Sequence, residues 1–505
     1  MRTVAGRTDR IVVVGAGLSG LAAATHLAGR QREVTVLERA AVPGGRAGRM
    51  DIGEFRLDTG PTVLTMPDII DETFAAVGES LAARLDLVPL LPAYQACFAD
   101  GSRLAVHSDA DAMAEEVAAF AGPEEARGYL GLRRWLTQMY QATYDQFIAA
   151  NIDSPLSLVS PQLARLVALG GLSTLDRQVG RFVHDDRLRR AFTFQSLYAG
   201  VAPQRALAVY GVIAYMDTVA GVFFPRGGVR ALPDALAAAA TDAGVDFQYG
   251  ETVVQLERNG THVAAVRTAS GRRFPCDAVV LTTEPHVSYR LLSRTPNRPA
   301  RLQAAPSAVV AHLSVRRQDT AHHTISFGAA WRETFAELID HGRTMTDPSL
   351  LITRPSATDP TLAPAGRDLV SVLAPVPNLD RSRIDWDRLA DRYVEEVLHI
   401  VERRVPGSTD DAYLLHTITP ADWADQDMTA GTPFSYAHSL TQTGPFRPGN
   451  FPRHSANAVL AGCGTVPGVG VPTALISGRL AADRITGTRS GPVRTTSGVA
   501  RGGMR

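Results

Sequence analysis

The 505-residue sequence contains no lysine, so its 51 strongly basic side chains are all arginines. This is a bias of composition, and we attach no function to it. The arginines balance 51 acidic residues, which leaves a formal net charge of zero. Proteins that bind nucleic acid generally carry a basic surface, so a nucleic-acid partner is not expected.

Cysteines are few, and long hydrophobic runs are absent from the sequence. Cys97, Cys276 and Cys463 are odd in number and far apart, which argues against a disulfide framework and against a clustered metal site. No stretch approaches the ~18 consecutive apolar residues of a membrane-spanning helix, and no apolar targeting core precedes the first predicted strand. We therefore expect a cytoplasmic protein that does not cross a membrane.

The chain is nevertheless long and of ordinary globular composition, with 45% hydrophobic and 20% charged residues. Hydrophobic cores rarely grow beyond about 250–300 residues, so two or three domains that share discontinuous segments are expected. A protein of this size can bury a large ligand.

A dinucleotide-binding motif is present in the stretch RIVVVGAGLSGLAAATHL. Residues 11–14 predict a strand, and Gly15, Gly17 and Gly20 follow in G-x-G-x-x-G spacing before a helical run. The three glycines respectively permit a tight turn, the approach of a pyrophosphate and close packing of helix on strand. The next predicted strand ends at Glu38, whose carboxylate suits ribose hydroxyls and repels a 2′-phosphate.

The following loop, ERAAVPGGRAGR, favours FAD over NAD as the cofactor. Gly44 and Gly45 let the chain pass close to the pyrophosphate and ribityl chain, and Arg46 can pair with a phosphate or pack beside the flavin. A plain glycine turn followed by a surface arginine accounts for the same letters. Neither a second G-x-G-x-x-G nor a C-x-x-x-x-C pair follows, which argues against a disulfide reductase that is reduced by NADPH.

A second glycine-rich loop occurs near the C-terminus, in AVLAGCGTVPGVGVPTALISGRLAA. Residues 458–461 predict a strand, the loop carries Gly462, Gly464 and Gly470, and a helix begins at about Pro472. The positive end of such a helix dipole can stabilise negative charge on a reduced flavin by ~0.3–1 kcal/mol. Tight packing alone is the alternative explanation for the glycines.

These motifs, with FRLDTGPTVLTMPD, RLRRAFTFQSLYAG, FFPRGGVRAL and HSLTQTGPFRP, resemble the bacterial-type phytoene desaturases over essentially the whole chain. These are FAD-dependent carotenoid dehydrogenases. The resemblance implies an α/β, glutathione-reductase-like FAD-binding Rossmann-type fold with a discontinuous substrate domain and a helical insert that associates with the membrane. It also implies hydride transfer from phytoene to flavin, which forms a conjugated carotene such as lycopene.

The resemblance divides the chain into four parts. We expect a discontinuous FAD-binding domain over residues 1–66, 222–292 and 440–486, and a substrate domain over residues 67–115 and 293–439. We expect a helical insert over residues 116–221 and a disordered tail over residues 487–505.

The resemblance also implies further site residues. Additional cofactor contacts fall on Arg39, Thr62, Val253, Thr465 and Val471. No metal ligands are expected, because the adjacent histidines of AHHTISFG point to opposite faces of a predicted strand.

Asp185 and Arg189 match an acidic and a basic position of the family, and we predict that they are catalytic. The alternative is a surface salt bridge, which is what pairs at i, i+4 spacing usually form.

The expected partners are an apolar carotenoid and the inner face of the cell membrane. The segment Leu156 to Leu175 is too short and too interrupted by glycine to span a bilayer, and we predict that Leu163, Leu166, Val167 and Leu172 share one face that enters it. An ordinary core helix is the alternative. Whether the chain forms a homo-oligomer stays open.

Three other functions remain as alternatives. One is another carotenoid-modifying activity of the family, such as a desaturase of shorter or oxygenated carotenoids, a ketolase or a saturase. The second is an amine oxidase, which the aromatic content of 7% disfavours because such enzymes need an aromatic cage. The third is a chaperone for prenylated proteins, which predicts degraded flavin glycines, whereas all three are intact here.

Overall fold

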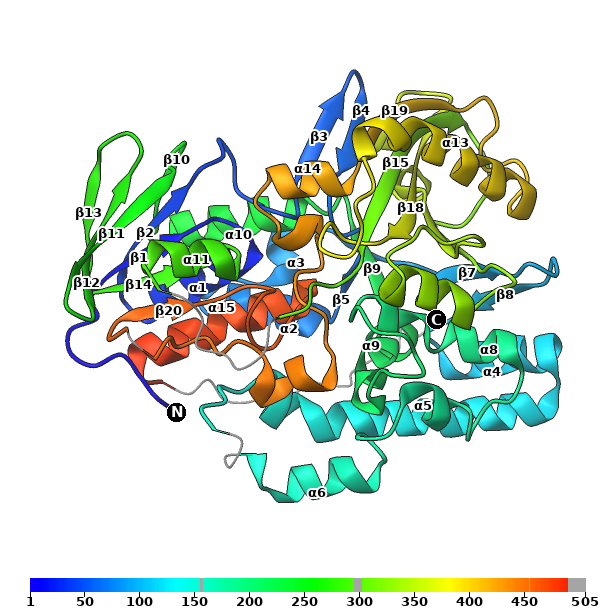
Figure 1. Cartoon of the computed structure of the whole chain (residues 1–505), viewed down its shortest axis with the longest axis horizontal. Helices are drawn as coiled ribbons and strands as arrows, with labels where there is room; N and C mark the ends of the chain where they lie inside the picture. The colour runs from blue at the N-terminus through cyan, green and yellow to red at the C-terminus, as the bar shows by residue number, and fades with distance from the viewer. Residues whose placement is uncertain (155–157, 295–301, 454, 489–505) are drawn as a thin grey trace, which may run out of the picture.

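The computed structural model describes residues 1–154, 158–294, 302–453 and 455–488 (Figure 1). Two large β-sheets lie side by side along the long axis of the molecule, and a mainly helical region lies below the second sheet in this view. The predicted α/β class with a parallel sheet is confirmed. Of the tail predicted over 487–505, residues 489–505 lie outside the described part of the chain.

The first sheet consists of five parallel strands in the order β10-β2-β1-β14-β20. The strands are β1 (Arg10–Val14), β2 (Glu33–Glu38), β10 (Asp246–Tyr249), β14 (Ala278–Leu281) and β20 (Ala458–Leu460). The central strands β1 and β14 are almost wholly buried, as parallel strands covered on both faces must be, which explains their runs of apolar side chains. The sheet therefore combines strands from the beginning, middle and end of the sequence.

Helices α1 (Leu18–Ala28), α10 (Ala231–Asp242) and α15 (Val471–Thr486) pack together beside this sheet, with α2 (Pro67–Ala75) against α1 and α15. Every residue of α1 is buried. A Cβ at Gly478 would lie only 2.3 Å from the carbonyl oxygen of Ser19, so glycine lets α1 and α15 touch. Figure 1 shows the two helices lying together although they come from opposite ends of the chain.

Several smaller elements accompany the two large sheets. They are an antiparallel sheet of β11 (Val253–Asn259), β12 (His262–Thr268) and β13 (Arg273–Pro275), a hairpin of β3 (Arg49–Ile52) and β4 (Phe55–Asp58), the sheet β5-β9-β6 (Leu64–Thr65, Val222–Pro225 and Leu87–Pro89), and the helices α3 (Leu81–Arg84) and α11 (Pro285–Leu291).

The second sheet has seven strands in the order β19-β15-β18-β17-β16-β7-β8. Only β16 and β7 pair in parallel. The strands are β7 (Tyr94–Cys97), β8 (Arg103–Val106), β15 (Ser307–Arg316), β16 (His323–Ser326), β17 (Leu350–Thr353), β18 (Arg367–Val376) and β19 (Tyr413–Ile418). Helix α13 (Trp386–Arg404) buries an apolar stripe in the same core cluster as β15 and β18, and the short helices α12 (Arg332–Phe335) and α14 (Pro420–Asp425) complete this part.

The helical region comprises α4 (Ala110–Ala121), α5 (Pro123–Thr143), the π-helical turn η1 (Tyr144–Ile148), α6 (Pro161–Ala168), α7 (Leu175–Val179), α8 (Asp186–Ala191), α9 (Gly211–Tyr215) and the π-helical turn η5 (Met216–Ala220). Helix α6 lies at the lower edge of the molecule (Figure 1).

The prediction that Leu163, Leu166, Val167 and Leu172 share one outward face is wrong. Leu166 is buried, whereas its neighbour Val167 and the more distant Leu172 are exposed. Successive helical residues are rotated by about 100°, so Leu166 and Val167 point in different directions. Leu172 lies beyond the end of α6.

Candidate active site

A cavity of about 1100 Å³ extends from the first sheet to the second and into the helical region. Its walls are largely apolar. The first sheet contributes the loops that follow its strands, while the second contributes Val310, Ile325 and Leu373 and the helical region contributes Leu163, Leu166, Tyr198 and Ile213. Ligands of open α/β sheets bind beyond the carboxyl ends of the strands, and this end of the cavity lies at that position in the first sheet.

The glycines after β1 form one end of the cavity. Gly15 and Gly17 line it, and Gly15 has a φ of +103° that a side chain rarely adopts. Gly20 does not line the cavity. A Cβ at this position would lie 1.9 Å from the carbonyl oxygen of Gly15, so glycine is needed here for the close packing of α1 against the loop. The buried Glu38 carboxylate accepts the backbone N–H groups of Ala16 at 2.7 Å and Ala40 at 2.8 Å.

The glycine doublet lies directly against this loop. The N–H of Gly44 donates to the Ala16 carbonyl oxygen at 2.9 Å, and Gly44 and Gly45 both line the cavity. Arg46 lines it too, with its Nη2 2.5 Å from Oε1 of Glu284. The buried Nε of Arg46 has no hydrogen-bond partner among the described residues, as expected of a donor that a bound phosphate or flavin oxygen would satisfy.

Glu284 holds this arginine at the cavity wall. Burial alone raises the pKa of a carboxyl group, but the Arg46 guanidinium and the Thr429 hydroxyl reverse that effect and lower the pKa of Glu284 below its ordinary value. Glu284 is therefore ionised at neutral pH and keeps Arg46 in place.

The second glycine loop closes the same end from the C-terminal side. Gly462, Gly464, Gly470 and Val471 line the cavity, and α15 begins at Val471. The free N–H groups and positive dipole end of this helix therefore face the cavity. Thr465 is different: its hydroxyl bonds the Gly462 carbonyl oxygen, and its side chain does not reach the cavity wall. The Thr465 side chain therefore stabilises the loop, and the cofactor contact at this position stays a prediction.

The remaining predicted cofactor positions also border the cavity. They are Arg39, Thr62 and Val253. Arg39 forms an ion pair with Asp427 at 2.7 Å, and Thr62 Oγ1 lies 3.0 Å from Nε2 of His323. Together with the two glycine loops, these groups line one end of the same cavity.

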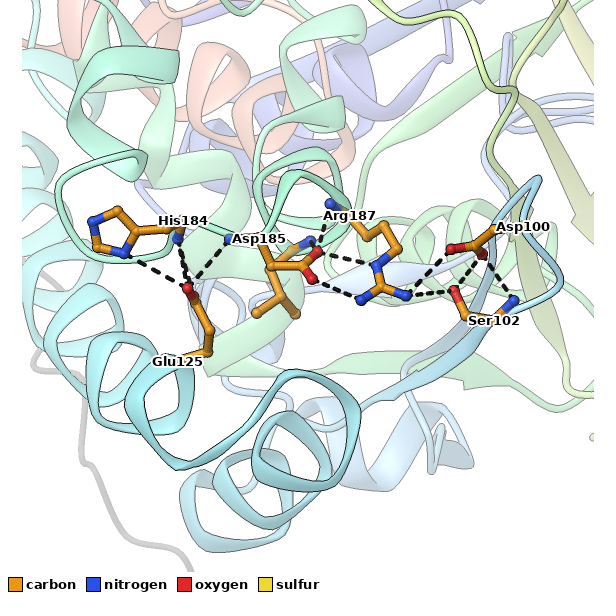
Figure 2. Close-up of polar contacts among 7 residues, drawn as sticks. Asp100, Ser102, Glu125, His184, Asp185 and Arg187 are labelled. Carbon is orange, nitrogen blue, oxygen red and sulfur yellow. Dashed lines mark hydrogen bonds and ion pairs between the residues drawn. The ribbon is translucent and has the colours of Figure 1, made fainter.

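The two residues predicted as catalytic lie elsewhere. Asp185 caps the N-terminus of α8 by accepting the N–H of Arg187, and its side chain pairs with the Arg187 guanidinium at 2.7 Å (Figure 2). Arg187 continues to Asp100 on the loop after β7, so Figure 2 shows a polar chain between surface segments. Arg189 instead pairs with Asp176 at 2.9 Å.

Neither Asp185 nor Arg189 lines the cavity. This position does not support a catalytic role for them, because Asp185 is the residue before the helix and its carboxylate turns back to the free N–H groups of α8. The neighbouring Arg187 then satisfies it. The i, i+4 spacing joins Asp185 and Arg189 only through the helical backbone, where the Arg189 N–H donates to the Asp185 carbonyl oxygen at 3.0 Å, while their side chains pair with Arg187 and Asp176.

The adjacent histidines are held separately by hydroxyl groups. His322 Nδ1 lies 2.7 Å from Thr358 Oγ1, while His323 faces Thr62. Burial lowers the pKa of His323 to about 4, so its ring is neutral at physiological pH. Within the described ranges no three histidine, cysteine or acidic side chains lie close enough together to hold a metal ion.

Sequence reasoning missed several polar groups in the cavity wall. Tyr210 Oη lies 3.0 Å from His438 Nδ1 and 2.6 Å from Thr443 Oγ1, so two segments that are distant in the sequence meet there. Asp217, on η5, also lines the cavity. Asp217 and Tyr210 lie outside every motif of the sequence analysis, whereas His438 and Thr443 lie within HSLTQTGPFRP, where the resemblance did not identify them as site residues.

Comparisons with known proteins agree with this geometry. The profile of the flavin containing amine oxidoreductase family matches residues 18–486. The chain is 59% identical to the phytoene dehydrogenase of Streptomyces griseus, over 97% of each chain. It is 34% identical to the zeta-carotene-forming phytoene desaturase of Myxococcus xanthus, over 94% of this chain and 93% of that protein.

Solved structures show the fold. Putrescine oxidase bound to putrescine superposes with a TM-score of 0.60 at 16% identity, over 95% of this chain and 99% of its own. The intact glycines, the unsatisfied Arg46 donor and the helix N-terminus at the cavity fit FAD, which is the cofactor. The chain is thus an FAD-dependent oxidoreductase that belongs to the phytoene desaturases within the flavin containing amine oxidoreductase family.

Proposed function

We propose that the protein desaturates phytoene to a conjugated carotene such as lycopene. The observation that carries this proposal is that one continuous cavity extends from the glycine loops of the first sheet into a large apolar chamber. A hydrocarbon offers no polar handle, so its affinity has to come from buried apolar surface at about 25 cal/mol per Å². Relatives named as phytoene desaturases over nearly the whole chain support the same substrate.

The glycines at 15 and 17, the doublet at 44 and 45 and Arg46 would hold the phosphates and ribityl chain of FAD, with Glu38 at the ribose and Val253 near the adenine. When bound, FAD supplies an acceptor for a hydride. The N-terminus of α15 would favour the negative charge that a flavin gains on reduction. We assign the five-stranded unit to a glutathione-reductase-like FAD domain, with the domain boundaries that the sequence predicts.

Leu163, Leu166 and Ile213 from the helical region, with Ile325 and Leu373 from the second sheet, would enclose the substrate. These side chains exclude water and fix the position of the reacting carbons along the chain. Positioning of this kind converts binding energy into a favourable geometry for reaction.

We further propose that the cavity opens toward a membrane. Three apolar side chains that line the cavity are exposed to solvent: Leu172 by 55%, Leu440 by 60% and Phe446 by 51%. They come from separate parts of the chain, because Leu172 follows α6 and the other two lie on the 3₁₀ turns Leu440–Gln442 and Gly444–Phe446. Val159 adds a side chain that is 75% exposed. Exposed apolar side chains around a cavity mouth are suited to insertion at a lipid surface.

No helix in the described ranges is long and apolar enough to cross a bilayer. We propose a peripheral position on the inner, cytoplasmic face of the cell membrane. The three cysteines are free thiols, which is in keeping with a reducing compartment. Residues 156 and 157 of the predicted membrane segment lie outside the described residues.

Incubation of purified protein with FAD and phytoene-loaded liposomes tests the function. We expect absorption bands of a conjugated carotene to appear, and their positions give the number of new double bonds. The Gly17→Val variant serves as a flavin-free control. Unchanged phytoene in the presence of flavin-loaded protein, or oxidation of a primary amine instead, would contradict the proposal.

A further inference from the structure

Asp217 is an isolated acidic side chain in the apolar part of the cavity. It lies on the π-helical turn η5 and lines the cavity wall. Its carboxylate forms no hydrogen bond or ion pair with any side chain or backbone group in the described part of the chain. The side chains whose ionisation it influences are two buried tyrosines, Tyr94 and Tyr198.

Other buried carboxylates of the protein are compensated. Asp58 accepts the N–H groups of Val229 at 2.8 Å and Arg230 at 3.2 Å, and Asp368 pairs with Arg354 at 2.9 Å. Burying a carboxylate without a partner is costly. Asp217 therefore contributes nothing evident to stability, and a role toward something that enters the cavity explains its presence.

The elements around Asp217 place it close to the junction of the two sheets. η5 packs against β5 and β9, and β5 directly follows the Thr62 loop that borders the cavity. His323 and Ile325 of the second sheet line the same cavity. A chain threaded between the sheets would pass the carboxylate.

We propose that the Asp217 carboxylate is the catalytic proton acceptor of the desaturation, an inference that rests on the proposed function. One carbon of the saturated bond loses a hydride, which is taken up with its electron pair by the bound FAD as oxidant. The adjacent carbon loses a proton to an oxygen of Asp217, and the electron pair of that C–H bond becomes the second bond of the new alkene. Asp217 then releases its proton to water before the next step.

The ionisation of Asp217 suits this role. Burial raises its pKa to about 7, so the side chain can accept and release a proton near neutral pH. Among the described residues, the titratable groups that it influences are the phenols of Tyr94 and Tyr198; β5 and β9 carry none, and α9, which also packs against η5, carries Tyr215. Arg133 of α5 approaches η5 only through the Thr218 carbonyl oxygen, at 3.3 Å.

The activity test compares Asp217→Asn with Asp185→Asn, a matched change in an acid outside the cavity. Under anaerobic conditions with phytoene liposomes, Asp217→Asn should slow flavin reduction by ~10²–10⁴-fold at unchanged FAD content, and Asp217→Glu should recover part of the rate. Asp185→Asn should change the rate by less than about 10-fold, since asparagine also caps helices. A loss of less than 10-fold in Asp217→Asn overturns the proposal, provided that the wild type desaturates phytoene. If the wild type does not, the proposed function itself fails.

A second readout does not depend on turnover. The melting temperature of the FAD-loaded wild type should fall relative to Asp217→Asn as the pH rises from about 4 to about 7. The folded protein keeps the proton in this range, whereas the unfolded chain releases it, so ionisation favours unfolding. At pH 8 the variant should be at least as stable as the wild type. A variant that is less stable at every pH would show that Asp217 is structural and would overturn the proposal.

Discussion

The two ends of the cavity differ in how they treat charge. At the cofactor end, Glu38 accepts two backbone N–H groups and Arg46 pairs with Glu284. At the apolar end, Asp217 lies among tyrosines and aliphatic side chains and has no ionic partner in the described ranges. Paired charges fix a polar ligand in one register, whereas an unpaired acid stays reactive. In our proposals the first end holds the flavin that accepts the hydride, and the second supplies the acid that accepts the proton.

Of the variants considered, Gly17→Val should have the largest effect, because it should abolish FAD binding at the cofactor end without unfolding the protein. The Cβ of a residue at position 17 would meet nothing closer than the Gly45 Cα at 4.0 Å, so the fold has room for it. The branched side chain would instead fill the space needed by the pyrophosphate, and we expect FAD affinity to fall by at least ~1000-fold.

Flavin absorbance after equilibrium dialysis measures this loss, and the melting temperature of the flavin-free variant should match that of the flavin-free wild type. Gly20→Val is the informative contrast, because its Cβ would collide with Gly15 and it should lower the melting temperature instead. Normal FAD binding by Gly17→Val would disprove the assignment of this loop.

The apolar end is tested at its mouth. Leu172→Asp combined with Phe446→Asp should reduce vesicle binding by roughly 10–100-fold, because two exposed apolar side chains are replaced by charges. Val254→Asp is a matched control, since Val254 is 55% exposed on β11 and does not line the cavity.

Vesicle flotation at low and high salt measures the effect. Binding of the wild type should survive high salt, because a protein with zero net charge gains little from anionic lipid. If the double variant floats as well as Val254→Asp, the mouth does not contact lipid. Leu166 is unsuitable for such a test, because it is buried and its replacement by aspartate would disturb the core.

The smallest effect is expected from the polar chain of Figure 2. Arg187→Ala removes the pairs with Asp185 and Asp100, both of which are at least partly exposed to solvent. Such pairs contribute about 1 kcal/mol or less, so the variant should lose little stability and keep its FAD content. Chemical denaturation gives the free energy of unfolding. A loss of FAD in this variant would mean that the surface network reaches the site.

How well sequence predicted the site depended on how local each feature is. The turn at Gly15, the end of β2 at Glu38 and the start of α15 each follow from a few consecutive residues, and the structure places these positions at the cavity. Asp185 carried a local signal that was misread: an aspartate immediately before a helix is a typical N-cap.

Asp217 had no local signal, and the motif that contains His438 and Thr443 did not reveal their contact with Tyr210, because that contact joins segments that are distant in the sequence. The prediction for α6 failed for a related reason. Leucine and valine are equally apolar, so hydropathy could not tell that Leu166 faces the cavity and Val167 faces outward.

By itself, then, the sequence determined the βαβ unit, the glycine positions and the preference for FAD, because backbone conformation and close approach depend on neighbouring residues. Only the tertiary structure decided which acid lies in the apolar cavity, which apolar side chains surround its mouth and which arginine neutralises each carboxylate. These features arise where strands and helices from separate parts of the chain converge, and burial and charge compensation are properties of that convergence.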